Sequence, residues 1–290
     1  MKVKAAAKIN LMLDVLGVLP DGYHSLFMIM QSVSCYDEVK VDRTVGKKIK
    51  IITGDTRIPT DKNNIAYKSA KAFFDFNNIT DCGIEIEIKK AIPMAAGLAG
   101  GSADGAAVLF CLNKLYNTKN DVNTLCKIGE AAGADIPFSL TGGTSLCMNT
   151  GGVIAPLPPL ENCYIVLCKP PIDISTAGAY KAIDEAKRLR HADKNAMLYA
   201  MANSDYPLMC EKMNNVFEQV IEVPKRPYIK SEMKKMGADA ALMSGSGPTV
   251  YGIFSSESKA KACYEKLKST FSETFLTVPV KSGIEIIDKL

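Results

Sequence analysis

The sequence predicts an α+β protein of two domains, and three observations support this. Strand-like stretches are interrupted by helix-like ones in the first half, and the second half repeats an alternation of strands and helices. A chain of 290 residues exceeds the size of most single cores. Glycine and proline are frequent over residues 149–159, so we expect domains at residues 1–153 and 154–290.

The first half is expected to contain strands and helices around a glycine-rich turn. Isoleucine alternates with charged residues from Ile84 to Ile88, which is typical of a half-buried strand. Small and apolar residues recur at helical spacing after Ser102, and a later helix would be closed by Gly133 as its C-cap. The predicted strands cover residues 2–16, 27–42, 47–53 and 83–90, and the predicted helices cover residues 64–76, 102–116 and 122–132.

The second half is expected to begin with a buried strand, because residues 163–168 have the apolar sequence CYIVLC. We find no internal repeat, low-complexity tract or heptad run in the sequence. The predicted strands of this half cover residues 163–168, 240–243, 249–254 and 276–285, and the predicted helices cover residues 177–190, 194–202, 210–221, 230–236 and 256–269.

The composition is that of an ordinary globular protein, with 47% hydrophobic and 23% charged residues. The formal net charge is +4 and the lysines are scattered, which gives little support to nucleic-acid binding. A modest positive excess does fit a site for highly anionic ligands.

The cysteines and the hydropathy pattern favour a cytosolic protein. There are nine cysteines and two histidines, and no Cys-x-x-Cys pair, which argues against a zinc site and for reduced thiols. No stretch of eighteen apolar residues and no signal peptide is found, so we expect no contact with a membrane.

Residues 93–107 have the sequence PMAAGLAGGSADGAA and lead from a predicted strand into a predicted helix. Glycine lets backbone N–H groups approach an anion, and a helix N-terminus carries a partial positive charge. We interpret the segment as a phosphate-binding turn, and a purely structural turn is the alternative. The Walker pattern fails because Gly101 is followed by Ser102 and Ala103 without a lysine, and Gly-x-Gly-x-x-Gly fails too.

Two charged residues lie in unusual surroundings. Asp135 follows Gly133 and Ala134 after a predicted helix, so its carboxylate could enter a cleft or could simply cap a turn. Lys8 lies in an otherwise apolar strand, where a cation is unusual unless it is paired or functional. The alternative for Lys8 is an edge-strand lysine that reaches solvent.

Several segments together resemble the GHMP kinase family. The glycine turn has the pattern Pro-x-x-x-Gly-Leu-x-Gly-Gly-Ser-Ala-Asp of that family's phosphate loop, with Ala95 and Ala99 where glycine is commoner. Four further segments share the likeness: KAAAKINLMLDV at residues 4–15, YDE at 36–38, GADIPF at 133–138 and MSGSGPT at 243–249. The sequence PDGYH at residues 20–24 is similar to the members that phosphorylate a cytidine-diphosphate-linked methylerythritol.

The resemblance implies a two-domain fold, with an N-terminal domain like ribosomal protein S5, a C-terminal ferredoxin-like domain and a cleft between them. It implies ATP-dependent phosphorylation of the 2-hydroxyl of 4-diphosphocytidyl-2-C-methyl-D-erythritol, in non-mevalonate isoprenoid precursor biosynthesis. ATP would be the co-substrate and Mg²⁺ is expected, with ligands that the sequence does not identify. Because that pathway runs in bacteria and plastids and no presequence is found, we expect a bacterial cytoplasmic enzyme.

The resemblance also implies roles for individual residues. Asp135 is the catalytic base, and Lys8 beside it keeps the carboxylate ionised and stabilises the transferring phosphoryl group. The ATP-binding residues are expected to be Pro93, Gly97, Leu98, Ala99, Gly100, Gly101, Ser102, Ala103, Asn64 and Lys90, the last two on the adenosine side. The substrate-binding residues are expected to be Asn10, Tyr23, His24, Thr176 and Tyr180.

Within this set, Tyr23 stacks on cytosine, His24 reads the base, and Tyr180 replaces a phenylalanine that is commoner in the family. A second glycine turn, residues 245–249, is expected to lie against the phosphate loop and support it.

Two rival interpretations remain open at the level of sequence. A GHMP kinase for homoserine, mevalonate or a sugar is disfavoured by the segment 20–24. A nucleotide-binding regulator or an RNA-binding protein on a similar scaffold is disfavoured because both Lys8 and Asp135 are present.

Overall fold

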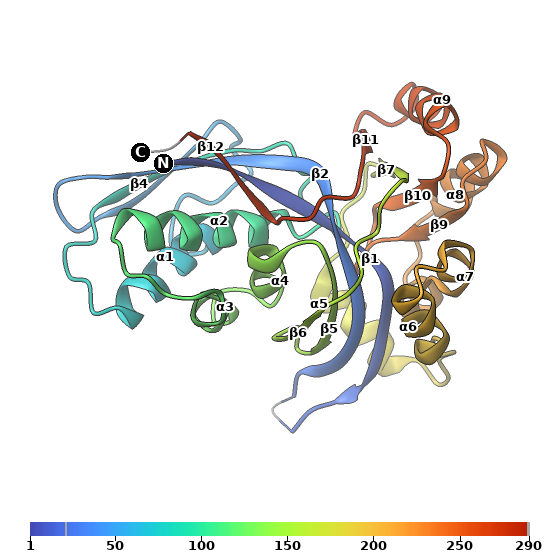
Figure 1. The fold of residues 1–290 in the computed structure, drawn as a ribbon, viewed down its shortest axis with the longest axis horizontal. Helices are drawn as coiled ribbons and strands as arrows, with labels where there is room; N and C mark the ends of the chain where they lie inside the picture. The colour runs from blue at the N-terminus through green and yellow to red at the C-terminus, as the bar shows by residue number, and fades with distance from the viewer. Residues whose placement is uncertain (21, 289–290) are drawn as a thin grey trace.

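The fold, described by a computed structural model over residues 1–20 and 22–288, is built on two β-sheets (Figure 1). The first sheet has the order β12-β1-β2-β4-β3, with β5 and β6 continuing from β2 and β8 beside β1. The second sheet has the order β11-β7-β10-β9. Asp21, which belongs to the segment 20–24, lies outside the described residues. The strands of the first sheet are β1 Lys2–Val18, β2 His24–Arg43, β3 Ile49–Thr53, β4 Ile84–Lys89, β5 Thr144–Asn149, β6 Val153–Pro156, β8 Asn214–Asn215 and β12 Ile284–Asp288.

The antiparallel pair β1 and β2 is the longest feature of the molecule, with 17 and 20 residues. At about 3.3 Å per residue, a strand of this length spans about 55 Å. In Figure 1 the pair runs from the α1–α4 side of the molecule toward the second sheet. Residues 5–15 of β1 are all buried, because other elements cover both faces of the strand. β1 therefore passes through the centre of the fold and carries its side chains into a closed interior.

Four helices cover one face of the first sheet (Figure 1): α1 Ile65–Phe76, α2 Gly100–Leu115, α3 Val122–Glu130 and α4 Ile136–Thr141. The sequence predicts one packed face for α2, but residues 102–109 are all buried. The helix is enclosed because α1 and α4 pack against it in addition to the strands. A Cβ on Gly105 would lie 2.6 Å from Ser69 Oγ, so the absence of a side chain lets α1 approach closely.

The second sheet is covered on one side by α8 and α9, which share its apolar core. Its strands are β7 Tyr164–Cys168, β9 Ala240–Met243, β10 Val250–Phe254 and β11 Thr274–Thr277. The remaining helices are α5 Thr176–Glu185, α6 Lys194–Ala202, α7 Tyr206–Lys212, the 3-10 helix η1 Val216–Gln219, α8 Arg226–Lys235 and α9 Glu257–Lys268.

Two predicted elements are wrong. The helix expected over residues 210–221 is the end of α7 followed by β8 and η1. The side chain of Asn215 accepts from Phe217 N and donates to the carbonyls of Met243 and Gly245, so it holds its own backbone in a non-helical form. The strand expected over residues 276–285 is two strands, β11 and β12, separated by Pro279 and a turn that ends at Gly283.

Smaller differences concern element ends and short elements. α5 ends at Glu185 rather than at residue 190, and the C-cap of α3 is Ala131 rather than Gly133. The sequence did not predict α4, β5 or β6. The expected boundary after residue 153 falls inside β6, and β12 returns from the second half to pair with β1.

Over the residues that the structure describes, no helix is long and apolar enough to cross a bilayer. The nine cysteines are free thiols, and most of them are buried.

Candidate active site

The glycine turn connects the strand β4 to the helix α2, as the sequence predicts. The backbone enters the left-handed region at Ala95, Gly97 and Ala99, with φ of 47°, 71° and 57°. Ala99 is the N-cap of α2 and makes no side-chain cap, and the first turn of this helix contains no acidic residue. The leading N–H groups of α2 therefore have no side-chain cap, which is the arrangement that favours a phosphate.

Two neighbouring segments fix the turn in place. Lys8 N, in β1, donates to Leu98 O at 3.1 Å, and Ser244 Oγ, directly before the second glycine turn, donates to Gly97 O at 2.9 Å. A Cβ on Gly97 would lie 2.1 Å from Ser244 O, so only glycine fits there. The expectation that residues 245–249 lie against the phosphate turn is confirmed, since a Cβ on Gly245 would lie 3.0 Å from Gly97 Cα.

Lys8 and Asp135 lie side by side, as the family resemblance implies. Lys8 Nζ is 3.9 Å from Asp135 Oδ2 and donates to Asn10 Oδ1 at 2.7 Å. Lys8 and Asn10 are two residues apart in β1 and therefore point to the same face. Asp135 is the N-cap of α4 but makes no side-chain cap, so its carboxylate is directed toward Lys8 and remains 30% exposed. The alternatives of a capping aspartate and a solvent-facing lysine are thus excluded, because Lys8 is only 5% exposed.

Asn10 is the centre of a buried polar cluster. Its Oδ1 accepts from Lys8 Nζ and from Gly245 N at 3.0 Å, and its backbone carbonyl accepts from the Tyr251 hydroxyl at 2.6 Å. Its Nδ2 is buried and has no hydrogen-bond partner among the described residues. A buried donor of this kind is costly unless something accepts from it, so a ligand oxygen beside Lys8 would complete the cluster.

A second group of predicted residues lies on β2 and α5. The rings of His24 and Tyr180 stack with centroids 4.6 Å apart, and Tyr180 packs edge-on against Phe217. His24 Nε2 lies 2.8 Å from Asp184 Oδ1, which leaves the other ring nitrogen available to a ligand. Tyr23 is 67% exposed next to them. The stack and the exposed tyrosine give two aromatic surfaces that suit a planar base.

Thr176 connects this group to the second glycine turn. It is the first residue of α5, and its Oγ1 lies 3.4 Å from Ser246 Oγ. The structure therefore places Thr176 next to the turn that supports the phosphate loop.

The two residues expected on the adenosine side make internal contacts. Asn64 caps α1 by accepting from Ala66 N, and it donates to Pro59 O at 2.7 Å. Lys90 Nζ donates to Asp104 Oδ2 at 2.8 Å and to Asp37, so it joins β2 to the first turns of α2. Both polar groups are mostly buried.

Sequence reasoning missed Asp37, Asp104 and Asp184. Asp37 is fully buried and also accepts from the N–H groups of Ala91 and Ile92, which directly precede the phosphate turn. Asp104 and Asp37 each lie in a quoted segment, but no spacing rule links them to Lys90. Asp184 follows Tyr180 by one helical turn, which was the available signal.

The described residues contain no group of three or more His, Cys, Asp or Glu side chains that could hold a metal ion. Mg²⁺ is commonly bound through one or two protein oxygens together with substrate phosphates, so a preformed cage is not required. A Cβ on Gly133 would lie 3.4 Å from Ser102 Oγ, which places this hydroxyl where the phosphate turn meets the turn that carries Asp135.

Comparisons with known proteins agree with this geometry. The family model of the GHMP kinases N terminal domain matches residues 64–143, and the model of the GHMP kinases C terminal matches residues 178–273. The 4-diphosphocytidyl-2-C-methyl-D-erythritol kinase of Clostridium perfringens is 42% identical over 288 residues, which are 98% of this chain and 99% of that protein.

Solved structures give the same picture. A crystal structure of 4-(cytidine 5'-diphospho)-2C-methyl-D-erythritol kinase matches with a TM-score of 0.79 and 27% identity, over 96% of this chain and 99% of that chain. The homoserine kinase of Cytophaga hutchinsonii also has a TM-score of 0.79, at 21% identity over 99% of this chain and 97% of that chain. The second match concerns the fold alone.

Proposed function

The chain belongs to the GHMP kinase family, to its branch of 4-diphosphocytidyl-2-C-methyl-D-erythritol kinases, and on this premise we propose how its residues carry out the reaction. The enzyme transfers the γ-phosphoryl group of ATP to the 2-hydroxyl of 4-diphosphocytidyl-2-C-methyl-D-erythritol. The products are ADP and the 2-phosphate, in the non-mevalonate route to isoprenoid precursors. The observation that carries the assignment of the reacting centre is the contact of 3.9 Å between Lys8 and Asp135 beside the phosphate turn.

The phosphates of ATP would be held by backbone N–H groups of the turn and of the first turn of α2. The residues of this site are Pro93, Gly97, Leu98, Ala99, Gly100, Gly101, Ser102 and Ala103. Hydrogen-bond donors that are already in place stabilise charge on a moving phosphoryl group without reorganisation. The Ser102 hydroxyl would hold Mg²⁺ beside the phosphates, where the ion would supply positive charge that neutralises the phosphate oxygens.

Asp135 acts as the base. As the 2-hydroxyl oxygen bonds to the γ-phosphorus, its proton passes to the Asp135 carboxylate, and the bond between the γ-phosphorus and the β–γ bridging oxygen breaks to release ADP. Lys8 lies within reach of the same centre and stabilises charge on the moving phosphoryl group. The unpaired Nδ2 of Asn10 would donate to an oxygen of the substrate and position it.

The cytidine end of the substrate would be bound by Tyr23, His24, Thr176 and Tyr180. Tyr23 stacks on the cytosine ring, and His24 bonds to the edge of the base while Asp184 and Tyr180 hold its ring in place. In this arrangement the phosphoryl-accepting hydroxyl lies near β1 and the cytosine ring lies near α5.

Asn64 and Lys90 are proposed as adenosine-side contacts. Each keeps one polar hydrogen beyond those used internally, because an amide nitrogen has two hydrogens and an ammonium group has three. Lys90 would therefore contact the nucleotide while it remains paired with Asp37 and Asp104.

We also propose a domain division at residues 153 and 154, since the two family models match on opposite sides of it. A bacterial cytoplasmic location is proposed because the similar kinase of Clostridium perfringens comes from a bacterium.

The decisive test is a turnover assay with ATP, Mg²⁺ and the cytidine diphospho alcohol. The expected result is ADP together with the singly phosphorylated product, identified by ³¹P NMR. Homoserine and mevalonate serve as comparison alcohols. Faster turnover of either of these, or no consumption of ATP with any alcohol, would contradict the assignment.

A further inference from the structure

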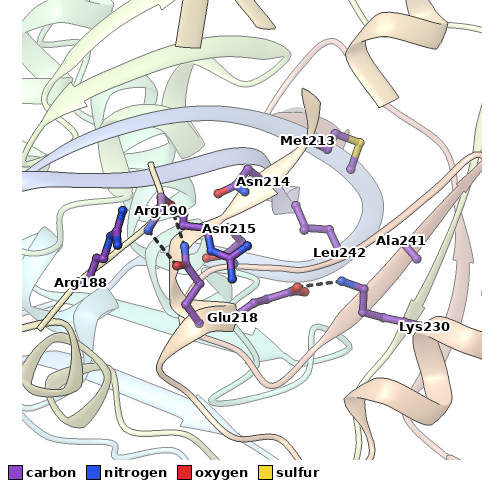
Figure 2. A pocket seen from close by; sticks show the side chains of 10 residues that line it. Arg188, Arg190, Met213, Asn214, Asn215, Glu218, Lys230, Ala241 and Leu242 are labelled. Atoms are coloured by element: carbon purple, nitrogen blue, oxygen red, sulfur yellow. Dashed lines mark hydrogen bonds and ion pairs between the residues drawn. The ribbon is translucent and has the colours of Figure 1, made fainter. Parts of the chain in front are cut away.

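A large cavity lies in the second half of the molecule, lined by residues that have no part in the reaction proposed above. Its volume is about 980 Å³, and its walls come from the segment 186–193, β8, η1, α8 and β9. Figure 2 shows Arg188 and Arg190 on one side and Lys230 on the other, with Leu242 among the apolar residues between them. The cavity is large enough for a drug-sized metabolite.

The charge of the lining is unbalanced. Three cationic side chains line the cavity, and Glu218 is the one carboxylate among the lining residues. Both oxygens of Glu218 are occupied, since Oε2 accepts from Lys230 Nζ at 2.7 Å and Oε1 accepts from Met243 N at 2.8 Å. In the described part of the chain, neither Arg188 nor Arg190 forms an ion pair through its side chain. The two guanidinium groups therefore give the cavity a positive potential that suits an anion.

The backbone that carries these arginines is held firmly. Gln219 accepts a hydrogen bond from Arg190 N at 2.9 Å and donates one to Arg190 O at 2.7 Å. The following residues are tied to β1, because Asp14 accepts from Ala192 N and lies 3.0 Å from the His191 ring. A fixed backbone lowers the entropy cost of using the two guanidinium groups together.

Asn214 gives the cavity a polar group without a partner. It lines the cavity from β8, and its Oδ1 is buried with no hydrogen-bond partner among the described residues. The apolar atoms of Met213 and Leu242 offer a surface for the uncharged part of a ligand.

From these features we propose that the cavity is a binding site for a small phosphorylated metabolite that carries at least two negative charges. The phosphate groups bind to Arg188 and Arg190, and the uncharged part of the ligand packs on Met213 and Leu242. The arginines favour phosphate over a single carboxylate because guanidinium groups bind phosphate oxygens in pairs.

The site is placed to influence the reaction, because β8 is shared between the cavity and the catalytic cluster. Asn214 pairs with Met12 of β1, and its neighbour Asn215 donates to Gly245 O at 2.8 Å. Gly245 N in turn donates to Asn10, which accepts from Lys8. A ligand that changes the position of β8 therefore acts on the support of the phosphate turn.

The test uses inorganic diphosphate as the probe. The active site is first filled with a non-hydrolysable ATP analogue and the cytidine diphospho alcohol, and diphosphate is then titrated calorimetrically without Mg²⁺ at constant ionic strength. We expect one additional binding site in the parent protein. The double variant Arg188→Gln and Arg190→Gln should weaken it at least tenfold, while Lys187→Gln should change it less than twofold. Lys187 is the matched control, because it is an exposed cation of the same segment that does not line the cavity.

A second measurement tests the coupling. At saturating ATP and alcohol and constant free Mg²⁺, diphosphate no longer competes at the active site. It should change kcat at least twofold in the parent protein and leave kcat of the double variant unaffected. The proposal is overturned if the filled protein binds no further diphosphate, if Lys187→Gln weakens binding as much as the double variant does, or if kcat of the parent does not respond.

Discussion

The ammonium group of Lys8 lies 3.9 Å from the carboxylate of Asp135, although 127 positions separate the two residues in the chain. β1 supplies the cation from the centre of the fold, and the start of α4 supplies the carboxylate. Asp135 is the N-cap of α4 and makes no side-chain cap bond, which leaves its carboxylate available to Lys8. The proposed reaction depends on this pair.

Asp135→Asn directly tests the role of Asp135 as the general base. The amide is nearly isosteric but accepts no proton, so we expect kcat to fall about 10²-fold or more, in the usual range for a lost general base. The Kd of ATP, measured calorimetrically, should stay within about twofold because the phosphate turn is untouched. A variant with kcat within tenfold of the parent would remove Asp135 from the mechanism.

Tyr23→Ala tests the binding of the cytosine ring. Stacking of a base on an aromatic ring contributes about 1–3 kcal/mol, which corresponds to a KM for the cytidine substrate raised by about 5-fold to 150-fold. kcat should change little, since Tyr23 is far from the transferred group in the proposed arrangement. Tyr199→Ala is the control, because Tyr199 is similarly exposed, at 62% against 67%, and has no proposed contact with the substrate. Equal KM values for the two variants would contradict the assignment.

Two substitutions of Tyr180 distinguish the role of its ring from the role of its hydroxyl. The stacking on His24 uses the ring alone, and among the described residues the hydroxyl of Tyr180 forms no hydrogen bond. Tyr180→Phe should therefore keep the KM for the cytidine substrate within about twofold, whereas Tyr180→Leu should raise it about tenfold. A large effect of Tyr180→Phe would instead assign a hydrogen bond to the hydroxyl.

The cluster of Lys90, Asp37 and Asp104 predicts a pH dependence of stability. Burial raises the pKa of Asp104 to about 7, with Asp37 adding to the rise and Lys90 opposing it. Burial lowers the pKa of Lys90, but the two carboxylates outweigh this, so its pKa is raised and the ammonium stays charged. Since an unfolded aspartate titrates near pH 4, the folded protein holds a proton that the unfolded chain has released between about pH 4 and pH 7.

The free energy of unfolding should consequently fall as the pH rises through this window. Asp104→Asn does not titrate and should flatten this dependence, as measured by urea unfolding at several pH values. Asp121→Asn is the control, because hydrogen bonds to Thr124 lower the pKa of Asp121 and its titration lies below the window. An unchanged slope in Asp104→Asn would show that Asp104 is ionised throughout the window.

The backbone conformation at Ala95 and Ala99 predicts that replacement by glycine stabilises the protein. Both have positive φ, where an alanine is strained by about 1–2 kcal/mol and glycine is not. Part of the gain from Ala99→Gly is offset by about 0.4–1 kcal/mol of extra chain entropy in the unfolded state. The net gain in the free energy of unfolding should be about 0.5–1 kcal/mol by urea denaturation. Ala106→Gly in the middle of α2 should have the opposite sign, and equal losses in both variants would contradict the strain argument.

The sequence predicted most elements whose pattern is local. The alternation of isoleucines over residues 84–88 located β4, and the glycine turn was placed correctly between β4 and α2. The failures occurred where distant contacts decide the structure. β5 and β6 exist because β2 offers an edge for pairing, and the backbone at Asn215 is fixed by carbonyls of Met243 and Gly245.

The site residues also divide into those that local sequence could identify and those that depend on distant contacts. Lys8 and Asp135 could be named because their residue types were unusual in local surroundings, and their proximity followed from the family resemblance. The partners of Lys90 could not be named, since Asp37 and Asp104 come from β2 and α2 and meet it only after folding. Their carboxylates are buried, and burial is a property of the packed structure rather than of sequence spacing.

The length of β1 and β2 restricts how the molecule can move. β1 pairs with β12 near its first residues and with β8 at Met12, and β2 runs beside it, so the two strands form one continuous ribbon within the first sheet. Bending this pair means breaking several ladder hydrogen bonds at once, except where its register shifts, between Ala6 and Ala7, between Asn10 and Met12, and between Val15 and Gly17. A bend of the β1–β2 pair is therefore easiest at these three shifts, and a hinge that swings one end of the pair away from the other would disrupt its ladder.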